Sequence, residues 1–213
     1  MTTTWLPYVI QQGDHVAKLA FRAGVDTQSV WEHETNKALA DLRGNLCVLL
    51  PGDVLHLPSS PPATLDVTKG TKNRYRAAVP TMQIKVELRS DSRDLGGHRF
   101  VLTGAGLPRP VEGKLTREAI LEAQIPITAR HVEVRLPDAG LVVRLRVGDL
   151  DPVAEESGVV QRLRNLGYLP RAGDITADDL DSAVKRFQAD KGLTVDGQLG
   201  AETRSALLSE HGC

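Results

Sequence analysis

Aromatic and sulfur-containing side chains are scarce in this sequence. Aromatic residues make up 4% of its 213 residues, and it has two cysteines, Cys47 and Cys213. Two cysteines so placed do not form the disulfide framework of a small secreted domain. Cys47 lies in the apolar stretch NLCVLL and is predicted to be a buried small hydrophobe. With so few aromatics the core must be mainly aliphatic, which favours several small modules over one large enzyme core.

The sequence also lacks a strong net charge and a long apolar run. It has 26 Lys and Arg against 27 Asp and Glu, with a pI of about 6.6. This balance removes the attraction to phosphate that a general nucleic-acid binder needs. No apolar run approaches the roughly 18 residues of a membrane span. Residues 5–10, the first apolar stretch, are too few for a secretory signal and follow no Lys or Arg, so we expect synthesis in the cytoplasm without such a signal.

Recognisable catalytic motifs are absent as well. The sequence HETN, residues 33–36, lacks the second His of a zinc-protease helix. No Cys or His cluster has metal-ligand spacing, and no G-x-S-x-G elbow occurs. We therefore predict no catalytic residue, no metal and no cofactor. A carboxylate pair for glycoside cleavage stays open, because Asp and Glu are plentiful.

Composition divides the chain at two places. LPSSPPATLD, residues 57–66, is rich in proline and reads as a stiff linker. GDLDPVAEESG, residues 148–158, is polar and acidic and precedes a helical pattern. The predicted fold class is multidomain α+β, with domains at 1–60, 75–150 and 151–213 and a Pro-rich linker at 61–74.

The first domain is predicted to be a βααβ unit. Strands are expected at residues 8–11 and 54–57, and a first helix ends at Gly24, which is suited to a C-cap. A second helix starts near Thr27, with Asp26 or Thr27 as its N-cap. The stretch YVIQQGDHVAKLAFRAGV, with WEHETN and LLPGDVLHLP further on, resembles a LysM domain, a module that binds peptidoglycan and chitin.

The LysM resemblance implies a glycan-binding groove between the loop after the first strand and the loop before the second. The positions carried over are Gly13, Asp14, His15, Asn36 and Pro51. The family usually has Thr or Ser where this chain has His15. Two alternatives stay open: His15 as an exposed first-turn residue, and Asn36 as a side chain that ties down a loop.

The middle domain is predicted to be an antiparallel β-sandwich. TMQIKVELR alternates apolar and polar residues, and HRFVLTG, HVEVRLP and LVVRLRV repeat the pattern. DLGG, GLPRPVEG and PDAG are read as turns between them. The segment faintly resembles Ig-like or carboxypeptidase-regulatory-like spacer domains. His131, Glu133 and Arg135 share one strand face, which we interpret as a solvated surface rather than a site.

Three helices are predicted in the last domain, with a capping box formed by Thr176 and Asp179. VVQRLRNLGYL and AVKRFQADKGLTVDGQLGAETRSALL closely resemble a type 1 peptidoglycan-binding domain. The resemblance and its Gly-rich loop imply ligand contacts at Tyr168, Asp196, Gly197, Gly200 and Thr203. For Asp196, Gly197 and Gly200 the alternative is a purely structural turn, and Tyr168 is equally suited to stacking on a sugar or to packing.

The resemblances together imply a non-catalytic peptidoglycan-binding protein with two wall-binding modules, acting at the cell wall or periplasm after export by a contractile or other non-classical route. The alternative is an adaptor of a type VI-like contractile injection machine, whose LysM-like module binds a spike or baseplate protein. A peptidoglycan-cleaving toxin is a third, less favoured hypothesis, because two binding modules leave about 70 residues for a catalytic domain. The expected partners are peptidoglycan and possible secretion proteins, without nucleic acid or a membrane span.

Overall fold

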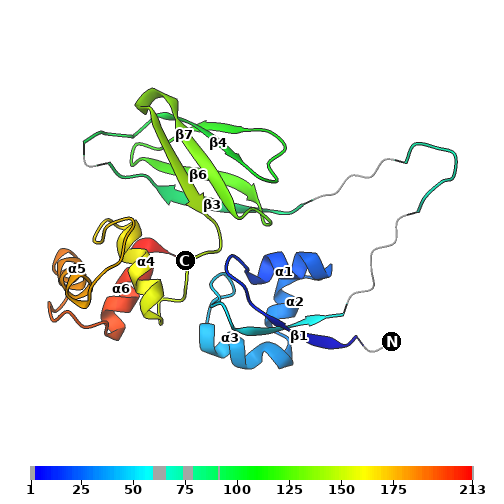
Figure 1. Cartoon of the computed structure of the whole chain (residues 1–213), viewed down its shortest axis with the longest axis horizontal. Coiled ribbons are helices and arrows are strands. Elements are labelled where there is room, and N and C mark those ends of the chain that lie inside the picture. The colour runs from blue at the N-terminus through cyan, green and yellow to red at the C-terminus, as the bar shows by residue number, and fades with distance from the viewer. Residues whose placement is uncertain (1–2, 60–65, 74–78, 91, 213) are drawn as a thin grey trace.

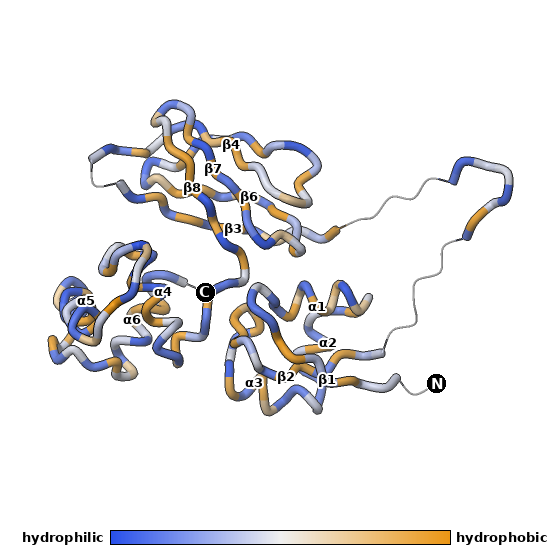
Figure 2. The backbone as a smooth tube through the Cα atoms, viewed as in Figure 1, coloured by the Kyte–Doolittle hydropathy of each residue, from blue (hydrophilic) through white to orange (hydrophobic). Residues whose placement is uncertain are grey.

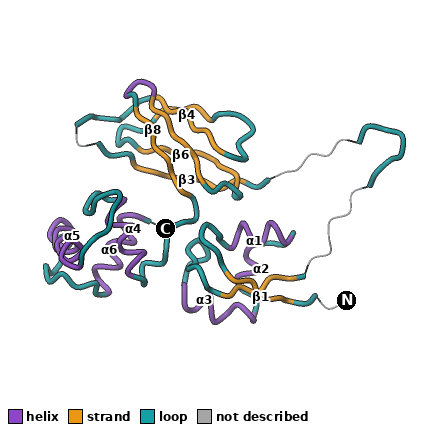
Figure 3. The backbone as a smooth tube through the Cα atoms, viewed as in Figure 1, coloured by secondary structure: helices purple, strands orange, loops and turns teal. Residues whose placement is uncertain are grey.

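The computed structural model describes residues 3–59, 66–73, 79–90 and 92–212 (Figure 1). The predicted linker at 61–74 lies partly outside these ranges, and Cys213 lies outside them. Helices lie mainly in the first and last parts of the described chain and strands in its middle, and the sheets are antiparallel (Figure 3), which confirms the α+β class. Buried apolar residues form three separate clusters, drawn from residues 5–57, 82–147 and 153–207. We call the corresponding parts the N-terminal module, the middle domain and the C-terminal module.

Two antiparallel strands frame the N-terminal module, β1 (Trp5–Val9) and β2 (Val54–Pro58). β1 begins three residues before the predicted strand and includes Pro7. A two-stranded sheet has only edge strands, where a missing N–H is tolerated. Cys47 is exposed, so the prediction of a buried cysteine was wrong. Only Val48 and Leu49 after it turn inward.

The helical part of this module has more pieces than the two predicted. It consists of α1 (Val16–Ala23), α2 (Thr27–Trp31), the 3-10 turn η1 (Glu34–Asn36) and α3 (Lys37–Arg43). Gly24 ends α1 with a φ of 70°, and Asp26 caps α2 by accepting from Ser29 N–H, as the sequence indicates. The predicted second helix is interrupted after Trp31, and Asn36, the last residue of η1, turns its side chain inward to bond β2.

The middle domain is a sandwich of two antiparallel sheets. One pairs β3 (Thr81–Glu87) with β6 (Ile120–Pro126), and the other has the order β5 (Val111–Lys114), β4 (Arg99–Gly104), β7 (His131–Leu136), β8 (Leu141–Arg146). A 3-10 turn, η2 (Pro137–Ala139), joins β7 to β8. Apolar and polar residues alternate along these strands (Figure 2), and the apolar faces meet in one core.

Two strands of the sandwich were not predicted. β5 begins inside GLPRPVEG, which had been read as a turn, and β6 carries a weak alternation that starts with two apolar residues and ends in Pro126. β6 nonetheless buries Leu121, Ala123 and Ile125 on one face. Pairing with β3 over seven residues compensates for its weak local pattern.

Three helices form the C-terminal module: α4 (Glu156–Asn165), α5 (Ala177–Asp190) and α6 (Ala201–His211). Thr176 and Asp179 form the predicted capping box at the start of α5. Leu163, Phe187 and Leu207 come from the three different helices and are fully buried together. No helix in the described ranges is long and apolar enough to cross a membrane.

The three parts contact one another near residues 147–155, where the chain leaves the middle domain (Figure 1). Gln12 Nε2 donates to Asp149 O at 3.0 Å, and Arg43 Nη1 lies 3.0 Å from a carboxylate oxygen of Glu155. A Cβ on Gly148 would lie 3.2 Å from Gly13 O, so the two backbones touch directly. The N-terminal module is therefore packed against the rest of the chain.

Candidate functional site

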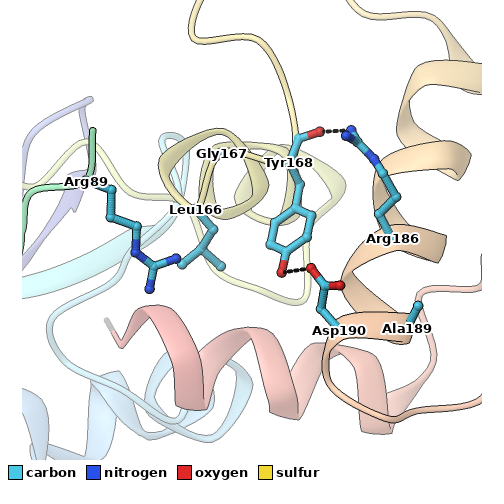
Figure 4. Close-up of a pocket in the computed structure, with 7 residues that line it drawn as sticks. All are labelled: Arg89, Leu166, Gly167, Tyr168, Arg186, Ala189 and Asp190. Atoms are coloured by element: carbon cyan, nitrogen blue, oxygen red, sulfur yellow. Dashed lines mark hydrogen bonds between the residues drawn. The ribbon is translucent and has the colours of Figure 1, made fainter. Parts of the chain in front are cut away.

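A groove of about 430 Å³ lies on the C-terminal module, between the end of α4 and α5 (Figure 4). We call it the Tyr168 groove. Its walls come from the turn after α4, from the last two turns of α5 and from one arginine of the middle domain. Its lining residues are Arg89, Leu166, Gly167, Tyr168, Arg186, Ala189 and Asp190.

Tyr168 is held by hydrogen bonds at its side-chain hydroxyl and at its backbone carbonyl. Its hydroxyl donates to Asp190 Oδ2 at 2.9 Å, and its carbonyl oxygen accepts from Arg186 Nη2. The ring packs edge-on against Phe187, with centroids 5.4 Å apart. Burial, followed by the hydrogen bond to Asp190, raises the pKa of Tyr168 to about 12. The phenol therefore stays protonated at physiological pH and directs its proton to Asp190.

Arg89 is the contribution of the middle domain to this groove. It follows β3, and Glu87 holds its guanidinium through two hydrogen bonds of 2.7 and 3.0 Å. Glu210 of α6 lies 3.5 Å from Nη2 and also pairs with Lys191 at 2.7 Å. The hydrogen bonds that Arg89 donates to Glu87, and then its interaction with Glu210, raise the pKa of Arg89 against the opposing effect of burial. The groove is thus shared between two parts of the chain.

A second, smaller hollow of about 260 Å³ lies at the loop between α5 and α6. Three of the predicted site residues line it, namely Asp196, Gly200 and Thr203. The structure therefore separates Tyr168 from the other residues predicted for this module.

The buried amide of Gln188 organises this loop. Its Nε2 lies 2.8 Å from Asp196 Oδ1, 3.1 Å from Gln198 O and 3.0 Å from Thr203 Oγ1. Its Oε1 accepts from the backbone N–H groups of Asp196 and Gly197 at 3.1 and 2.9 Å. Both Gln188 and Thr203 are almost fully buried. The polar atoms of this hollow are thus largely engaged in holding the loop, which favours the structural alternative for Asp196 and places the Thr203 hydroxyl within the same network.

Gly197 has a backbone requirement of its own. Its φ is +75°, and a Cβ built there would lie 2.2 Å from Asp181 Oδ1. Glycine adopts this φ without strain, and any other residue would also have to displace the side chains of Asp181 and Lys185. Gly200, by contrast, has open space around it and precedes the first residue of α6 as its N-cap.

The residues predicted for the N-terminal groove lie mostly inside the chain. Asp14 is 3% exposed, accepts from Tyr8 Oη at 2.8 Å and pairs with Lys18 Nζ at 2.9 Å. Burial acts to raise the pKa of Asp14, but hydrogen bonds from Lys18, Tyr8 and the Gln11 N–H outweigh it and lower the pKa. Gly13 is buried beside Asp149.

His15 connects the N-terminal module to the middle domain. Its Nδ1 accepts from Lys18 N–H as the N-cap of α1, and its Nε2 lies 3.1 Å from Ile127 O. These two partners require a neutral ring with the proton on Nε2. Burial lowers the pKa of His15, against the opposing effect of the Ile127 carbonyl. His15 is thus not the exposed first-turn residue that the sequence left open.

Asn36 and Pro51 differ in their surroundings. Asn36 is 1% exposed, and its amide bonds Val30 O at 2.8 Å, His56 O at 2.9 Å and His56 N at 2.7 Å. These hydrogen-bond partners of the Asn36 side chain are all backbone groups, in agreement with a role in holding the loop. Pro51 is exposed in the turn before β2.

Sequence reasoning missed two residues that shape these sites. Gln188 lies in the stretch AVKRFQADKG and was not predicted as a site residue, although a polar residue on the apolar face of an amphipathic helix indicates a buried hydrogen-bond network. Arg89 ends the alternating stretch TMQIKVELR, and no local signal places it beside a helix more than 70 residues away. Within the described ranges, no three His, Cys, Asp or Glu side chains gather as a metal site.

Comparison with known proteins gives one match. Searches among curated proteins and among solved structures gave none. The match is to a family model described as a putative peptidoglycan binding domain, over residues 159–207, which contain the Tyr168 turn, α5 and most of α6. The C-terminal module is therefore similar to putative peptidoglycan binding domains, and this similarity supports peptidoglycan binding.

Proposed function

We propose that this chain is a non-catalytic peptidoglycan-binding protein that holds the wall through its C-terminal module. The observation that carries the proposal is the family match over residues 159–207 together with the Tyr168 groove, whose lining residues other than Arg89 all lie in that range. Peptidoglycan offers sugar hydroxyls, N-acetyl groups and peptide carboxylates. A shallow groove with an aromatic ring and a few fixed polar groups suits such a ligand.

Sedimentation with purified insoluble sacculi tests the proposal directly. We expect the full-length chain to pellet with sacculi and to be released by an excess of soluble muropeptides. The supernatant should contain no newly released muropeptides, since the proposed protein does not cleave its ligand. A chain that stays in the supernatant contradicts wall binding, and release of soluble fragments contradicts the non-catalytic role.

The burial of the N-terminal loop favours a particular role for the N-terminal module. Asp14, His15 and Asn36 are engaged within the chain, so a LysM-like groove at these positions is not open to a glycan in this arrangement. This supports the second candidate, in which the module contacts protein and the chain acts as an adaptor that brings a wall-binding module to a larger assembly, such as a contractile injection machine.

Glycan binding by the N-terminal module is tested in the full-length chain by disabling the other site. The variant Tyr168→Ala with Asp190→Ala should lose sacculus binding if the C-terminal module alone binds the wall. Retained binding would support a second wall site in the N-terminal module and would contradict the adaptor role.

A further inference from the structure

The last strand of the middle domain, β8, has one edge that no described strand covers. It ends the sheet of order β5-β4-β7-β8 and pairs, within the described ranges, with β7 alone (Figure 2). Just beyond it, Val147 N–H donates to Arg130 O, and hydrogen-bonded pairs alternate along an antiparallel ladder. The N–H and C=O groups of Val142, Arg144 and Arg146 therefore point away from β7, at the open edge.

The inner face of β8 is incompletely covered as well. Leu141, Val143 and Leu145 pack against the core of the sandwich but are only partly buried, since β8 lies at the edge of its sheet. On the outer face of the same strand, Val142 is 59% exposed. An added strand would complete the main-chain ladder and would also remove apolar surface of β8 from water.

The outer face of this edge is basic. Arg144 and Arg146 project from it, with side chains that are 81% and 82% exposed. They approach the carboxylates of Glu133 and Asp149 only to 3.6 and 3.5 Å, which is longer than a well-formed hydrogen bond. Glu133 is bound more closely by Arg135, at 2.7 Å. The two edge arginines therefore present guanidinium N–H groups to a partner.

The positions of these arginines select the kind of strand that can be added. A second copy of this chain is poorly suited, because the register that pairs two whole β8 strands antiparallel sets Arg144 opposite Arg144, and like charges directly opposite each other are destabilising. Carboxylates at the facing positions would instead be attracted. Side chains alternate between the two faces of a strand, so the residues between those carboxylates would cover the inner, apolar face of β8.

We propose that the open edge of β8 binds an extended segment of a partner protein in which acidic and apolar residues alternate. The segment adds one antiparallel strand to the four-stranded sheet, with main-chain hydrogen bonds to Val142, Arg144 and Arg146 and with carboxylates beside the two arginines. This inference goes beyond wall binding, because no residue of β8 lines the Tyr168 groove. It gives the middle domain a role of its own, the capture of a protein partner.

The test titrates the full-length chain, labelled with nitrogen-15, with three seven-residue peptides that are blocked at both ends. This length is enough to span the six residues of β8. The first peptide alternates Val and Glu, the second has Lys in place of each Glu, and the third is the first peptide N-methylated at each Glu. N-methylation leaves the charges in place and removes the N–H groups that would bond the edge of β8.

The expected result has an affinity and a pattern along the strand. The Glu peptide should bind at least about tenfold more tightly than the Lys peptide or the N-methylated peptide, since each loses one of the two kinds of contact. The amide protons of Val142, Arg144 and Arg146 should shift downfield on binding. Those of Val143 and Leu145 point toward β7 and should shift less.

Charge reversal at the edge checks the selection. The double variant Arg144→Glu with Arg146→Glu should bind the Lys peptide more tightly than the Glu peptide. Arg99→Glu is the matched control, because Arg99 is an exposed arginine of β4 in the same sheet, and Lys114 lies opposite it to pair with the new carboxylate. This control should keep the preference for the Glu peptide, and all the variants should pellet with sacculi as wild type does.

Three results would overturn the proposal. Equal affinity for the Glu peptide and its N-methylated form would mean that the arginines attract any flexible polyanion without strand pairing. Equal affinity for the Glu and Lys peptides would remove the charge selection. If none of the peptides binds, the arginines only protect the edge of the sheet against pairing. In each case the test of wall binding with sacculi is unaffected.

Discussion

The buried amide of Gln188 gives the sharpest test of how the C-terminal module is held together. The change is Gln188→Leu, which keeps the approximate volume and removes every polar atom of the side chain. The structure gives this amide five partners: Asp196 Oδ1, Gln198 O, Thr203 Oγ1 and the N–H groups of Asp196 and Gly197.

The expected cost follows from these contacts. A net hydrogen bond contributes about 0.5–1.5 kcal/mol, and a buried group left unsatisfied costs about 1–3 kcal/mol. Part of the loop is exposed, so water can replace some partners, and the buried leucine recovers some apolar free energy. We therefore expect the free energy of unfolding of the module to fall by about 2–4 kcal/mol.

Thermal unfolding measures the loss of stability, and native-state hydrogen exchange measures the loosening of the loop. In a module of this size, about 1 kcal/mol shifts the midpoint by roughly 4–8 °C, so a loss of about 2–4 kcal/mol should lower the C-terminal transition by about 8–32 °C. The amides of Asp196 and Gly197 should exchange faster. Gln198→Leu is the control, since its exposed side chain forms no hydrogen bond with the described residues. If the two leucine variants melt together, Gln188 does not organise the loop.

Three further perturbations test other parts of the chain. Gly197→Ala and Gly192→Ala should each cost about 1–2 kcal/mol of module stability, because both positions have a positive φ (+75° and +67°) and a Cβ at 197 meets only side-chain atoms that can move away. A much larger melting shift for Gly197→Ala would contradict this reasoning. Arg43→Gln removes the cation that pairs with the buried carboxylate of Asp53 and leaves it only the N–H of Leu50, so it should destabilise the N-terminal module by about 3 kcal/mol in urea unfolding, an effect that added salt should not reproduce in wild type. Burial lowers the pKa of His15, so an opened module binds a proton that the packed form does not. The stability that neutral His15 contributes is therefore fully present above about pH 6.5, the ordinary pKa of a histidine. It is lost as the pH falls from there through the lowered pKa of the packed form. The protection factors of the amides in residues 11–15, which are corrected for the slower intrinsic exchange at low pH, should therefore fall from pH 7.5 to 5.5 in wild type but not in His15→Gln. An equal fall in both would assign the effect to another group.

Helix ends and turn glycines could be predicted from the sequence because their causes lie within a few residues. Asp26 caps α2 by accepting the N–H three residues later, and Thr176 and Asp179 exchange hydrogen bonds across the same spacing. Gly24 adopts the left-handed conformation that other residues avoid. Such signals depend on local backbone geometry alone and are readable without the fold.

The composition of the sites could not be predicted in the same way. His15 meets Ile127 across 112 positions of sequence, and Arg89 reaches Glu210 from a different domain. Neither contact produces a periodic pattern in the amino-acid sequence. The motif around Gly13 is typical of a glycan-binding loop and equally of a tight turn, and the sequence does not reveal that Gly148 packs against it.

The contacts at residues 147–155 also change how two modules in one chain are expected to cooperate. A stiff linker between independent binders raises avidity only when both sites can reach the ligand together. Here Arg43, which pairs with Asp53, also forms an ion pair with Glu155, and Gln12 donates a hydrogen bond to the carbonyl of Asp149. The N-terminal module is therefore restrained by the segment that follows the last strand of the middle domain. The same segment leads into α4, whose Gln161 bonds the same carbonyl of Asp149. A force or partner that pulls the N-terminal module away would therefore act on the start of the wall-binding module, and the middle domain couples the two because it supplies both Arg89 and the carbonyl that His15 requires.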